Sequence, residues 1–368
     1  MNTGPVGVAI IGAGVISKQY LDNLTHFPDI QVCMVADLYP EVAKARADEY
    51  GIATSGPPQL ALEHPDVEII VNLTIPTAHV EIDMAAIRAG KHVFSEKPIA
   101  LDRHSARALL NEADQAGLRV GCAPDTFLGA GLQTARKAIM RGDIGVPLTA
   151  LTLFQTPGPE VWHPSPAFLF KHGAGPLFDI GPYYLTALAQ CLGSFRRVAA
   201  VGSQSRTTRV IRSGPKAGEV FDVEVPTHVT FLAQFDGGVS STSIISFDSP
   251  RTRTGFVEIT GTEAVLSVPD PDSFDGKLRI CRTGDGDWID IPTTGPTNGR
   301  GIGVLDMARS IRGGVPHRAS GQLAYHVLDT MASIEEAVES GTYVDVASSA
   351  PKSAPVPEEW APDTATLF

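Results

Sequence analysis

A lysine stands between a carboxylate, Glu96, and a proline, Pro98, in the stretch VFSEKPIA. The proline ring fixes one backbone angle and removes an N–H, so it stiffens the chain directly after Lys97. A surface turn would account for this arrangement, because lysine is mostly exposed and proline ends strands. The alternative is a proton-transfer group. When an ammonium is partly desolvated beside another positive charge, its pKa falls toward neutral pH and it can accept a hydroxyl proton.

A glycine-rich turn, GAGVIS, follows the first apolar run of the chain. Gly12 permits a tight turn, and Gly14 lets a pyrophosphate approach the backbone closely. The helix expected to begin at Val15 and Ile16 would offer N–H groups and a partial positive charge to phosphate oxygens. Ser17 occupies the position where a third glycine is usual, and it is small enough to keep the helix close to the strand. The pattern indicates a dinucleotide-binding turn.

An acidic residue, Asp37, ends the second apolar run and supports this interpretation. A carboxylate at this place can accept both hydroxyl hydrogens of an adenosine ribose, and it repels the 2′-phosphate of NADP. We therefore expect NAD rather than NADP as the cofactor, although Tyr39 or Arg46 could change that choice. Taken alone, Asp37 could equally be a helix cap or a solvated loop acid.

The first third of the sequence alternates short apolar runs with helical patterns. The expected strands cover residues 6–11, 31–36, 67–73, 92–95 and 118–123. Apolar runs of this kind are typical of strands buried on both faces, so we expect an α/β domain with a doubly wound parallel sheet, a Rossmann fold. Ligands of such sheets bind beyond the carboxyl ends of the strands. Glu96 and Lys97 follow one of these ends, so a nicotinamide ring is the positive charge expected beside Lys97.

After residues 136–145 the pattern changes to strands that follow one another without helices between most of them. The pair Asp236–Gly237 is typical of a hairpin turn between two of these strands. We expect an NAD-binding domain at residues 1–125 and, at residues 126–368, a substrate-binding α+β domain with an open, mostly antiparallel sheet. The tail is rich in proline, alanine and serine, which is typical of an extended arm or a partly disordered end.

A helix is expected to begin within the stretch GAGPLFDIGPYY, residues 173–184. Asp179 would lie in its first turn, near the partial positive charge of the helix end, with Tyr183 one turn further along. Tyr184 belongs to the apolar face and is expected in the core. Four side chains could contact a substrate, or could instead be ordinary structural residues: Asp125, Trp162, His163 and Lys171.

The bulk composition narrows the class of protein. A chain of 368 residues exceeds what a single core usually serves, so two domains are expected. The formal net charge of -12 repels nucleic-acid phosphate and anionic membrane surfaces, which argues against both as partners. The four cysteines lack the spacing of a zinc site, so no metal is expected, and they are typical of core residues in a reducing compartment. With neither an export signal nor a long apolar segment, the sequence predicts a cytoplasmic protein.

Four motifs, in this order and spacing, carry a family resemblance: GAGVIS near the amino terminus, TIPTAHV at 74–80, SEKPIA at 95–100 and GAGPLFDIGPYY at 173–184. Over nearly its whole length the sequence resembles the glucose-fructose oxidoreductase, inositol dehydrogenase and rhizopine catabolism (Gfo/Idh/MocA) family of NAD(P)-dependent oxidoreductases. The resemblance implies that Lys97 takes part in catalysis and touches the nicotinamide ribose. It also implies cofactor contacts for three residues that follow a strand: Thr74, Pro76 and His79.

The resemblance assigns roles to the helix after the glycine run as well. Asp179 matches the family's substrate-orienting acid. Tyr183 stands at the histidine position of the family's DxGxH motif, as in the branch of the family in which tyrosine is implied to be the acid/base. Thr186 replaces the acid that many members carry three residues beyond that histidine, which departs from inositol-type recognition.

The expected activity is hydride transfer between nicotinamide and a hydroxyl-bearing carbon of a sugar or cyclic polyol. The hydroxyl proton would go either to Tyr183, activated by Lys97, or to Lys97 itself. Two other functions stay open: NAD-assisted cleavage of a glycoside, as rarer relatives perform, and a dinucleotide-binding regulator without catalysis. The resemblance further implies a homodimer or homotetramer that forms through the carboxy-terminal sheet.

Overall fold

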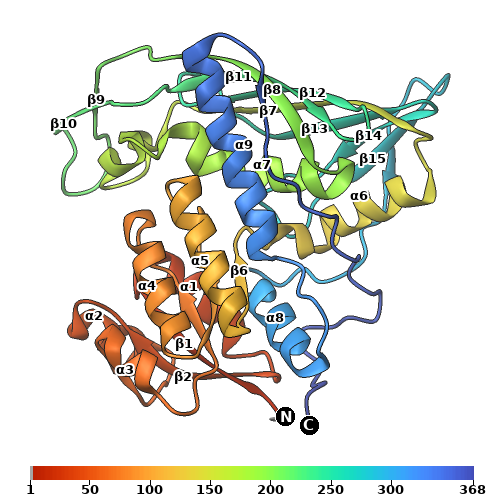
Figure 1. The fold of residues 1–368 in the computed structure, drawn as a ribbon. Helices are drawn as coiled ribbons and strands as arrows, with labels where there is room; N and C mark the ends of the chain where they lie inside the picture. The colour runs from red at the N-terminus through yellow and green to blue at the C-terminus, as the bar shows by residue number, and fades with distance from the viewer. Residues whose placement is uncertain (1–2) are drawn as a thin grey trace. The chain divides into compact units, whose positions relative to one another are not determined.

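The computed structural model describes residues 3–368, and the chain forms two compact units (Figure 1). The first unit combines the amino-terminal part up to Ala130 with residues 295–328 and 353–368. The second unit combines residues 131–294 with residues 329–352. These units differ from the two consecutive ranges expected from the sequence, 1–125 and 126–368, because two late segments return to the first unit.

A parallel sheet of six strands forms the centre of the first unit. Its strands are β1 (Val6–Ile11), β2 (Ile30–Ala36), β3 (Ser55–Gly56), β4 (Ile69–Asn72), β5 (His92–Ser95) and β6 (Val120–Cys122). Their order is β3-β2-β1-β4-β5-β6, and every neighbouring pair is parallel. All residues of β1 and β4 are buried, as expected for apolar runs covered on both faces. The strand order reverses between β1 and β4, which is where ligands of such sheets bind.

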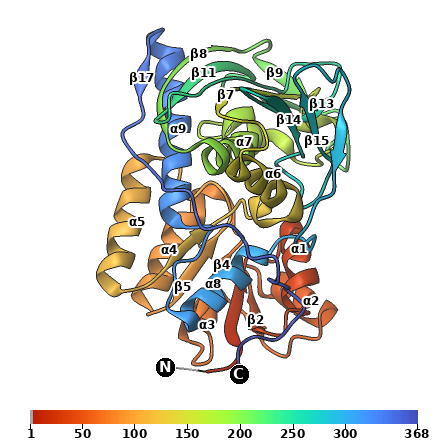
Figure 2. The same cartoon turned by 90° about the vertical axis from the view of Figure 1, so that its right-hand side faces the viewer.

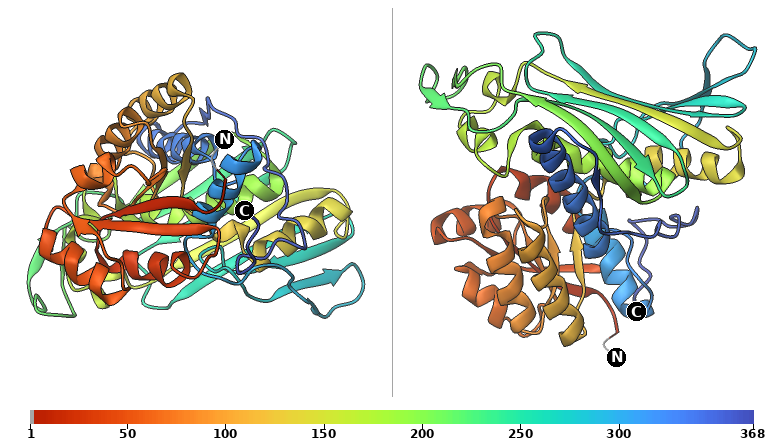
Figure 3. Two further views of the ribbon diagram at one scale, coloured as in Figure 1. Left: turned by 90° about the horizontal axis from the view of Figure 1, so that it is seen from below. Right: turned by 45° about the horizontal axis from the view of Figure 1, so that its top comes forward.

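Helices cover both faces of this sheet, as the view from below shows (Figure 3). They are α1 (Val15–Leu24), α2 (Pro40–Glu49), α3 (Pro58–Glu63), α4 (His79–Arg88), α5 (Arg103–Ala116) and α8 (Ile302–Gly313). In α5 the local sequence sets both bounds: the Asp102 side chain accepts the N–H of Ser105 at the start, and Gly117, with a φ of 68°, ends the helix. The doubly wound sheet expected from the sequence is confirmed.

The helix α8 comes from late in the chain and packs beside β6. At Gly121 of β6 a Cβ would lie only 2.5 Å from the Met307 Cε of α8, so the helix approaches the strand more closely than a larger residue would allow. Because the apolar face of α8 is buried here, the first unit needs a segment that lies far beyond residue 125 in sequence.

The carboxy-terminal arm, residues 353–368, contains neither helix nor strand, and it is bound to the first unit. Asp29 is completely buried, and its carboxylate accepts hydrogen bonds from the backbone N–H groups of Thr366 and Leu367. The same carboxylate accepts a hydrogen bond from the Arg309 guanidinium of α8 at 2.7 Å. The tail is therefore the extended arm that its composition predicts, and a buried carboxylate holds its last residues.

A mixed, mostly antiparallel sheet of nine strands forms the second unit (Figure 2). Its strands are β7 (Pro147–Gln155), β8 (Phe195–Ser203), β11 (His228–Phe235), β12 (Ser240–Ser246), β13 (Arg253–Gly261), β14 (Ala264–Val268), β15 (Leu278–Arg282), β16 (Ile289–Ile291) and β17 (Val344–Asp345). The order is β16-β15-β14-β13-β7-β12-β11-β8-β17, and β7 and β12 are the parallel neighbours. A separate antiparallel pair consists of β9 (Thr208–Val210) and β10 (Val220–Asp222).

Two helices, α6 (Ala130–Arg141) and α7 (Gly175–Leu192), lie on one face of this sheet (Figure 2). Every residue of α7 is buried except Asp179 and Ile180, which are half-buried. The long helix α9 (Gly321–Ser340) begins in the first unit and ends in the second. None of the helices among residues 3–368 has the length and apolar character needed to span a bilayer.

Candidate functional site

The glycine turn after β1 leaves the amino end of α1 open. Gly12 has a φ of +104°, and a Cβ there would lie 2.7 Å from the Leu73 carbonyl group, so only glycine fits. Around Gly14, by contrast, no atom lies within 4 Å of the Cβ position, and the helix start lacks a side-chain cap. Val15 is 85% exposed. An accessible helix start beside a glycine backbone fits a pyrophosphate, as the sequence pattern predicts.

Ser17 replaces the third glycine of the usual turn without opening the packing. It is completely buried, and its hydroxyl donates a hydrogen bond to the Gly14 carbonyl oxygen at 2.7 Å. The hydroxyl therefore ties the helix back to the turn from within.

Asp37 follows β2 directly and contacts the same turn. Its carboxylate accepts the backbone N–H of Ala13 at 2.8 Å and that of Tyr39 at 3.0 Å. Arg46 of α2 donates to the carbonyl oxygens of Ala13 and Gly14 at 3.4 and 3.2 Å, and it forms an ion pair with Glu49. Asp37 thus places a negative charge next to the glycine turn, where an adenosine ribose is expected.

Lys97 is half-buried and follows β5 after one intervening residue. The preceding carboxylate of Glu96 is buried and accepts the Lys97 backbone N–H at 3.0 Å and the Tyr20 hydroxyl at 2.8 Å. Glu96, predicted as a cofactor contact, is therefore held inside the unit. Through its hydrogen bond to the Lys97 N–H, the Glu96 carboxylate fixes the backbone at Lys97.

His79 joins the two loops that follow β4 and β5. The ring is 1% exposed, with Nδ1 2.7 Å from the Pro98 carbonyl oxygen and Nε2 3.1 Å from the Thr74 carbonyl oxygen. Burial lowers the pKa of His79, although both carbonyl contacts oppose this shift. The ring predicted as a cofactor contact instead faces the backbone of the neighbouring loops. Pro76 and Thr74 are half-buried in the loop that the ring secures.

Asn72 and Asp83 form a buried polar pair beneath these loops, which the sequence patterns did not predict. The Asn72 amide at the end of β4 donates to the Asp83 carboxylate at 2.7 Å and to the His79 carbonyl oxygen at 3.1 Å. Its oxygen accepts the hydroxyl of Thr74 at 2.7 Å. The available signal was a polar residue within the apolar run VEIIVNL, together with an acid one helical turn after His79.

Asp125, predicted as a substrate contact, lies inside the first unit and is completely buried. One carboxylate oxygen accepts the backbone N–H groups of Gly301 and Gly303 at 2.9 Å each, at the start of α8. Burial raises the pKa of Asp125 to about 6, while these hydrogen bonds oppose the shift. In the structure, Asp125 therefore binds the amino end of α8, a helix that lies far from it in sequence.

In the second unit, Asp179 lies beside an aromatic group. The ring of His163 makes edge contacts with Trp162 and Phe168, at centroid distances of 5.4 and 5.5 Å. Burial lowers the pKa of His163, and the negative charge of Asp179 acts in the opposite direction. Trp162 is 68% exposed. An acid, an imidazole and an exposed indole are therefore brought together in this unit.

The prediction that Asp179 lies in the first turn of its helix is wrong. Because α7 begins at Gly175, Asp179 is in the second turn, and Tyr183 follows one turn later. Tyr183 and Tyr184 are both buried, at 6% and 2% exposure. Tyr184 lies in the core, as predicted, and its hydroxyl accepts the Gly255 N–H at 2.9 Å.

Lys171, another predicted substrate contact, forms an ion pair with Glu224 at 2.5 Å. Both side chains are nearly half exposed, so this pair contributes little to stability. Among residues 3–368 there is no group of three His, Cys, Asp or Glu side chains arranged to hold a metal ion.

The predicted residues thus form two groups, each within one unit. The first group surrounds the glycine turn and the loops after β4 and β5, all at one edge of the parallel sheet. The second group gathers at the start of α7 and in the segment before it. The first fits a dinucleotide, and the second fits a polar ligand with an apolar face.

Two family models match the chain. The model described as "Oxidoreductase family, NAD-binding Rossmann fold" matches residues 6–123, and the model described as "GFO/IDH/MocA C-terminal domain" matches residues 132–267. The two models belong to one family, and together they cover both the parallel sheet and much of the second unit.

Similar proteins carry names of sugar and polyol enzymes. The chain is 28% identical over 261 residues to 1,5-anhydro-D-fructose reductase of Ensifer adhaerens, covering 70% of this chain and 74% of that protein. It is 24% identical over 265 residues to scyllo-inositol 2-dehydrogenase (NAD(+)) of Bacillus subtilis, covering 72% and 73%. A levoglucosan dehydrogenase solved in complex with NADH and L-sorbose has a TM-score of 0.81 at 23% identity, covering 93% of this chain and 99% of that one. This last likeness concerns the fold.

Asp83 makes a testable contribution to the pH dependence of stability. Burial raises its pKa to about 7, whereas in the unfolded chain it has the ordinary value of about 3.9. Between these pH values the folded state keeps a proton that the unfolded state has lost, so the free energy of unfolding falls as pH rises. Asp83→Asn should remove this slope, by up to about 1.4 kcal/mol per pH unit. Urea unfolding across this range measures it.

The exposed Asp114 of α5 provides the matched control for this experiment. Asp114→Asn should leave the wild-type pH profile unchanged. Parallel profiles of the wild type and Asp83→Asn would show that Asp83 ionises normally.

Proposed function

Because the chain belongs to the Gfo/Idh/MocA family of NAD-binding oxidoreductases, we propose that it transfers a hydride between NAD and a hydroxyl-bearing carbon of a sugar or cyclic polyol. The names of the similar proteins support the substrate class, since they include a reductase of an anhydrosugar and dehydrogenases of inositol and levoglucosan.

The placement of Lys97 gives this proposal its strongest support. Lys97 follows β5 at the same sheet edge as the glycine turn after β1, and β4, with its own loop, lies between these two strands. His79 connects the loops after β4 and β5 through the carbonyl oxygens of Thr74 and Pro98. An ammonium held at the ligand-binding edge of the sheet suits proton transfer better than an ordinary surface lysine does.

Each part of the first group has a proposed task toward the cofactor. NAD, when bound, supplies the hydride acceptor or donor. The turn from Gly12 to Ile16 would hold its pyrophosphate, Asp37 its adenosine ribose, and the loop after Thr74 the part nearer the nicotinamide. Lys97 would contact the nicotinamide ribose.

The second group would handle the substrate. Asp179 would orient the substrate hydroxyl as a hydrogen-bond acceptor, and Tyr183 would exchange the hydroxyl proton, helped by Lys97. Alternatively, Lys97 accepts the proton and Tyr183 holds the oxygen. Trp162 and His163 would contact the sugar, because an exposed indole offers an apolar surface to the C–H face of a ring.

We further propose that the protein works in the cytoplasm. Its four cysteines are unpaired, as a reducing compartment favours: Cys33, Cys122, Cys191 and Cys281.

We also propose that the protein self-associates through the outer face of the nine-stranded sheet. On the sheet face opposite α7, Leu151 and Leu232 are 43% and 48% exposed and lie in one row across the strands. Light scattering should give at least twice the chain mass of 38.9 kDa, and a monomer mass would contradict this interface.

Replacing Lys97 tests the proposed reaction. Lys97→Met keeps the length of the side chain but removes the ammonium, so turnover should fall about 10²- to 10⁴-fold, the usual contribution of a positioned acid or base. NAD binding, measured by calorimetry, should persist. The assay follows NADH absorbance with a panel of aldoses, polyols and glycosides.

The control for this experiment is Lys44→Met, which changes an exposed lysine of α2 and should leave turnover unaffected. Unchanged turnover in Lys97→Met would contradict the catalytic role. Reducing sugar released from a glycoside without net NADH would instead favour NAD-assisted cleavage. NAD binding without any turnover in the wild type would favour a regulator.

Replacing Asp37 tests the proposed preference for NAD. Asp37→Ser removes the charge that repels a 2′-phosphate, so the ratio of kcat/KM with NAD to that with NADP should fall at least about tenfold, or ~1.4 kcal/mol. The control is Glu41→Gln, an exposed acid in the first turn of α2, which should keep the ratio. A ratio that stays the same in Asp37→Ser would mean that another residue selects the cofactor.

A further inference from the structure

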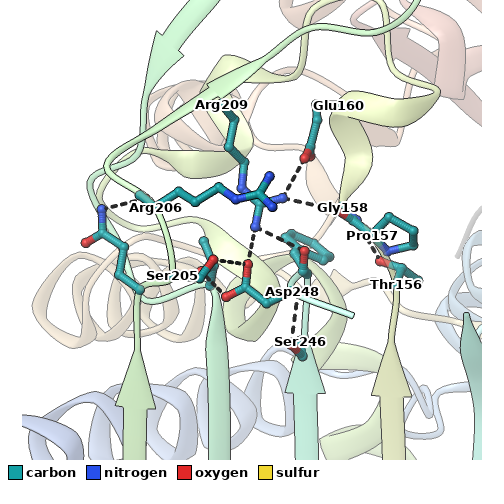
Figure 4. A network of polar contacts seen from close by, with 12 residues as sticks. Thr156, Pro157, Gly158, Glu160, Ser205, Arg206, Arg209, Ser246 and Asp248 are labelled. Atoms are coloured by element: carbon teal, nitrogen blue, oxygen red, sulfur yellow. Dashed lines mark hydrogen bonds and ion pairs between the residues drawn. The ribbon is translucent and has the colours of Figure 1, made fainter. Parts of the chain in front are cut away.

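Arg209 of β9 is buried within the second unit, with a side chain that is only 2% exposed (Figure 4). One guanidinium nitrogen donates to the Glu160 carboxylate at 2.5 Å and to the Pro157 carbonyl oxygen at 3.1 Å. The other donates to the Phe247 carbonyl oxygen at 3.1 Å and to the Asp248 carboxylate. A single side chain thus connects β9, the segment after β7 and the end of β12.

The same guanidinium also contacts the far end of the segment after β7. Its carbon lies 5.0 Å from the centre of the Phe170 ring, stacked as a cation on an aromatic face. Phe170 ends the short turn Pro166–Phe170, whereas Pro157 and Glu160 lie at the start of the segment. Arg209 therefore holds both ends of residues 157–170.

The charges in this cluster make Arg209 hard to replace. The Glu160 side chain is 4% exposed and the Asp248 side chain 15%, so two carboxylates depend on one buried guanidinium. Asp248 also accepts the hydroxyl groups of Ser205 and Thr227, at 2.6 and 2.5 Å. Without Arg209, buried negative charge would remain without its counter-ion.

The backbone is fitted closely to this ion pair. Gly158 has a φ of +109°, and a Cβ there would lie 2.3 Å from a Glu160 carboxylate oxygen and 2.6 Å from an Arg209 guanidinium nitrogen. The start of the segment is therefore shaped around the charged groups, and any side chain at this position would displace them.

The aromatic side chains lie between the two ends held by Arg209. Trp162, His163 and Phe168 form a row of edge contacts, and Trp162 and Phe168 are 68% and 49% exposed. The imidazole of His163 interacts electrostatically with Asp179 of α7. The segment thus presents open aromatic surface beside the acid proposed to orient the substrate.

We infer that Arg209 is a positioning residue for substrate recognition: it holds residues 157–170 so that Trp162 and His163 lie beside Asp179 and receive the apolar face of a sugar or cyclic polyol ring. This inference rests on the proposed function. Arg209 itself is buried, so it would act through the aromatic residues and not through contact with the substrate.

Kinetics of Arg209→Gln separate this role from a general effect on stability. With the best substrate of the wild type, KM for that substrate should rise at least tenfold, while kcat and the KM for NAD change less than about threefold. The control is Arg206→Gln, which alters an exposed arginine just before β9 and should behave as the wild type. A folded Arg209→Gln protein with an unchanged substrate KM would overturn the inference.

A double-mutant cycle tests whether Arg209 acts through the indole. Trp162→Leu alone should also raise the substrate KM, and adding Arg209→Gln should raise it little further, because both changes remove the same contact. Independent, multiplicative effects of the two substitutions would overturn the inference. If Arg209→Gln does not fold, Glu160→Gln replaces it in the cycle, since it weakens the hold on the start of the segment and keeps the Asp248 contact.

Fluorescence distinguishes failure of this inference from failure of the proposed function. The chain has three tryptophans, so Trp288→Phe with Trp360→Phe leaves Trp162 as the sole reporter. In that background, Arg209→Gln should shift the emission of Trp162 and change its quenching by acrylamide, without any substrate present. If the wild type acts on no sugar or polyol, the proposed function fails while this measurement still decides whether Arg209 holds the segment, and unchanged emission would overturn that.

Discussion

The buried ring of His79 is the contact on which the arrangement of the first unit's chemistry depends. It meets one carbonyl oxygen after β4 and one after β5, so the two loops at the ligand edge of the sheet share a single anchor. Asn72 binds the same region from below and connects it to Asp83 in α4. Because buried polar groups are costly unless they are hydrogen-bonded, this network specifies one backbone position for Lys97. The position of the half-buried Lys97 is thus set by hydrogen bonds among buried residues.

The second unit follows the same rule with charged groups. Glu160 and Arg209 are buried and Asp248 is largely buried, and the segment that they hold exposes the aromatic side chains of Trp162 and Phe168. Such a cluster is weak as a source of net stability, because desolvation offsets much of its attraction. It does, however, allow few geometries, which would suit the role that we propose for the segment, presenting an indole in a fixed place. In both units, buried polar groups orient residues for which we propose a role in binding or proton transfer.

The sequence predicted the fold well where patterns are local. Apolar runs such as VGVAII and VEIIVNL predicted buried parallel strands, and the motifs after them predicted the family. The prediction failed where partners lie far apart along the chain. Nothing near Asp125 indicates that it binds the start of α8, and nothing near residue 125 indicates that residues 295–328 complete the first unit. Asp179 was misplaced by one helical turn because two glycines in the stretch HGAGP obscure the helix start.

The discontinuous first unit also bears on how the protein is made. Its sheet strands leave the ribosome first, but α8 and the arm that Asp29 binds are translated only after the whole stretch from residue 131 to 294. The apolar surface beside β6, which α8 later covers, therefore stays exposed while residues 131–294 of the second unit are being synthesised. The first unit therefore begins to leave the ribosome before the second unit but is completed after it. A nascent chain interrupted before residue 295 would have a nucleotide-binding sheet without α8, one of its covering helices.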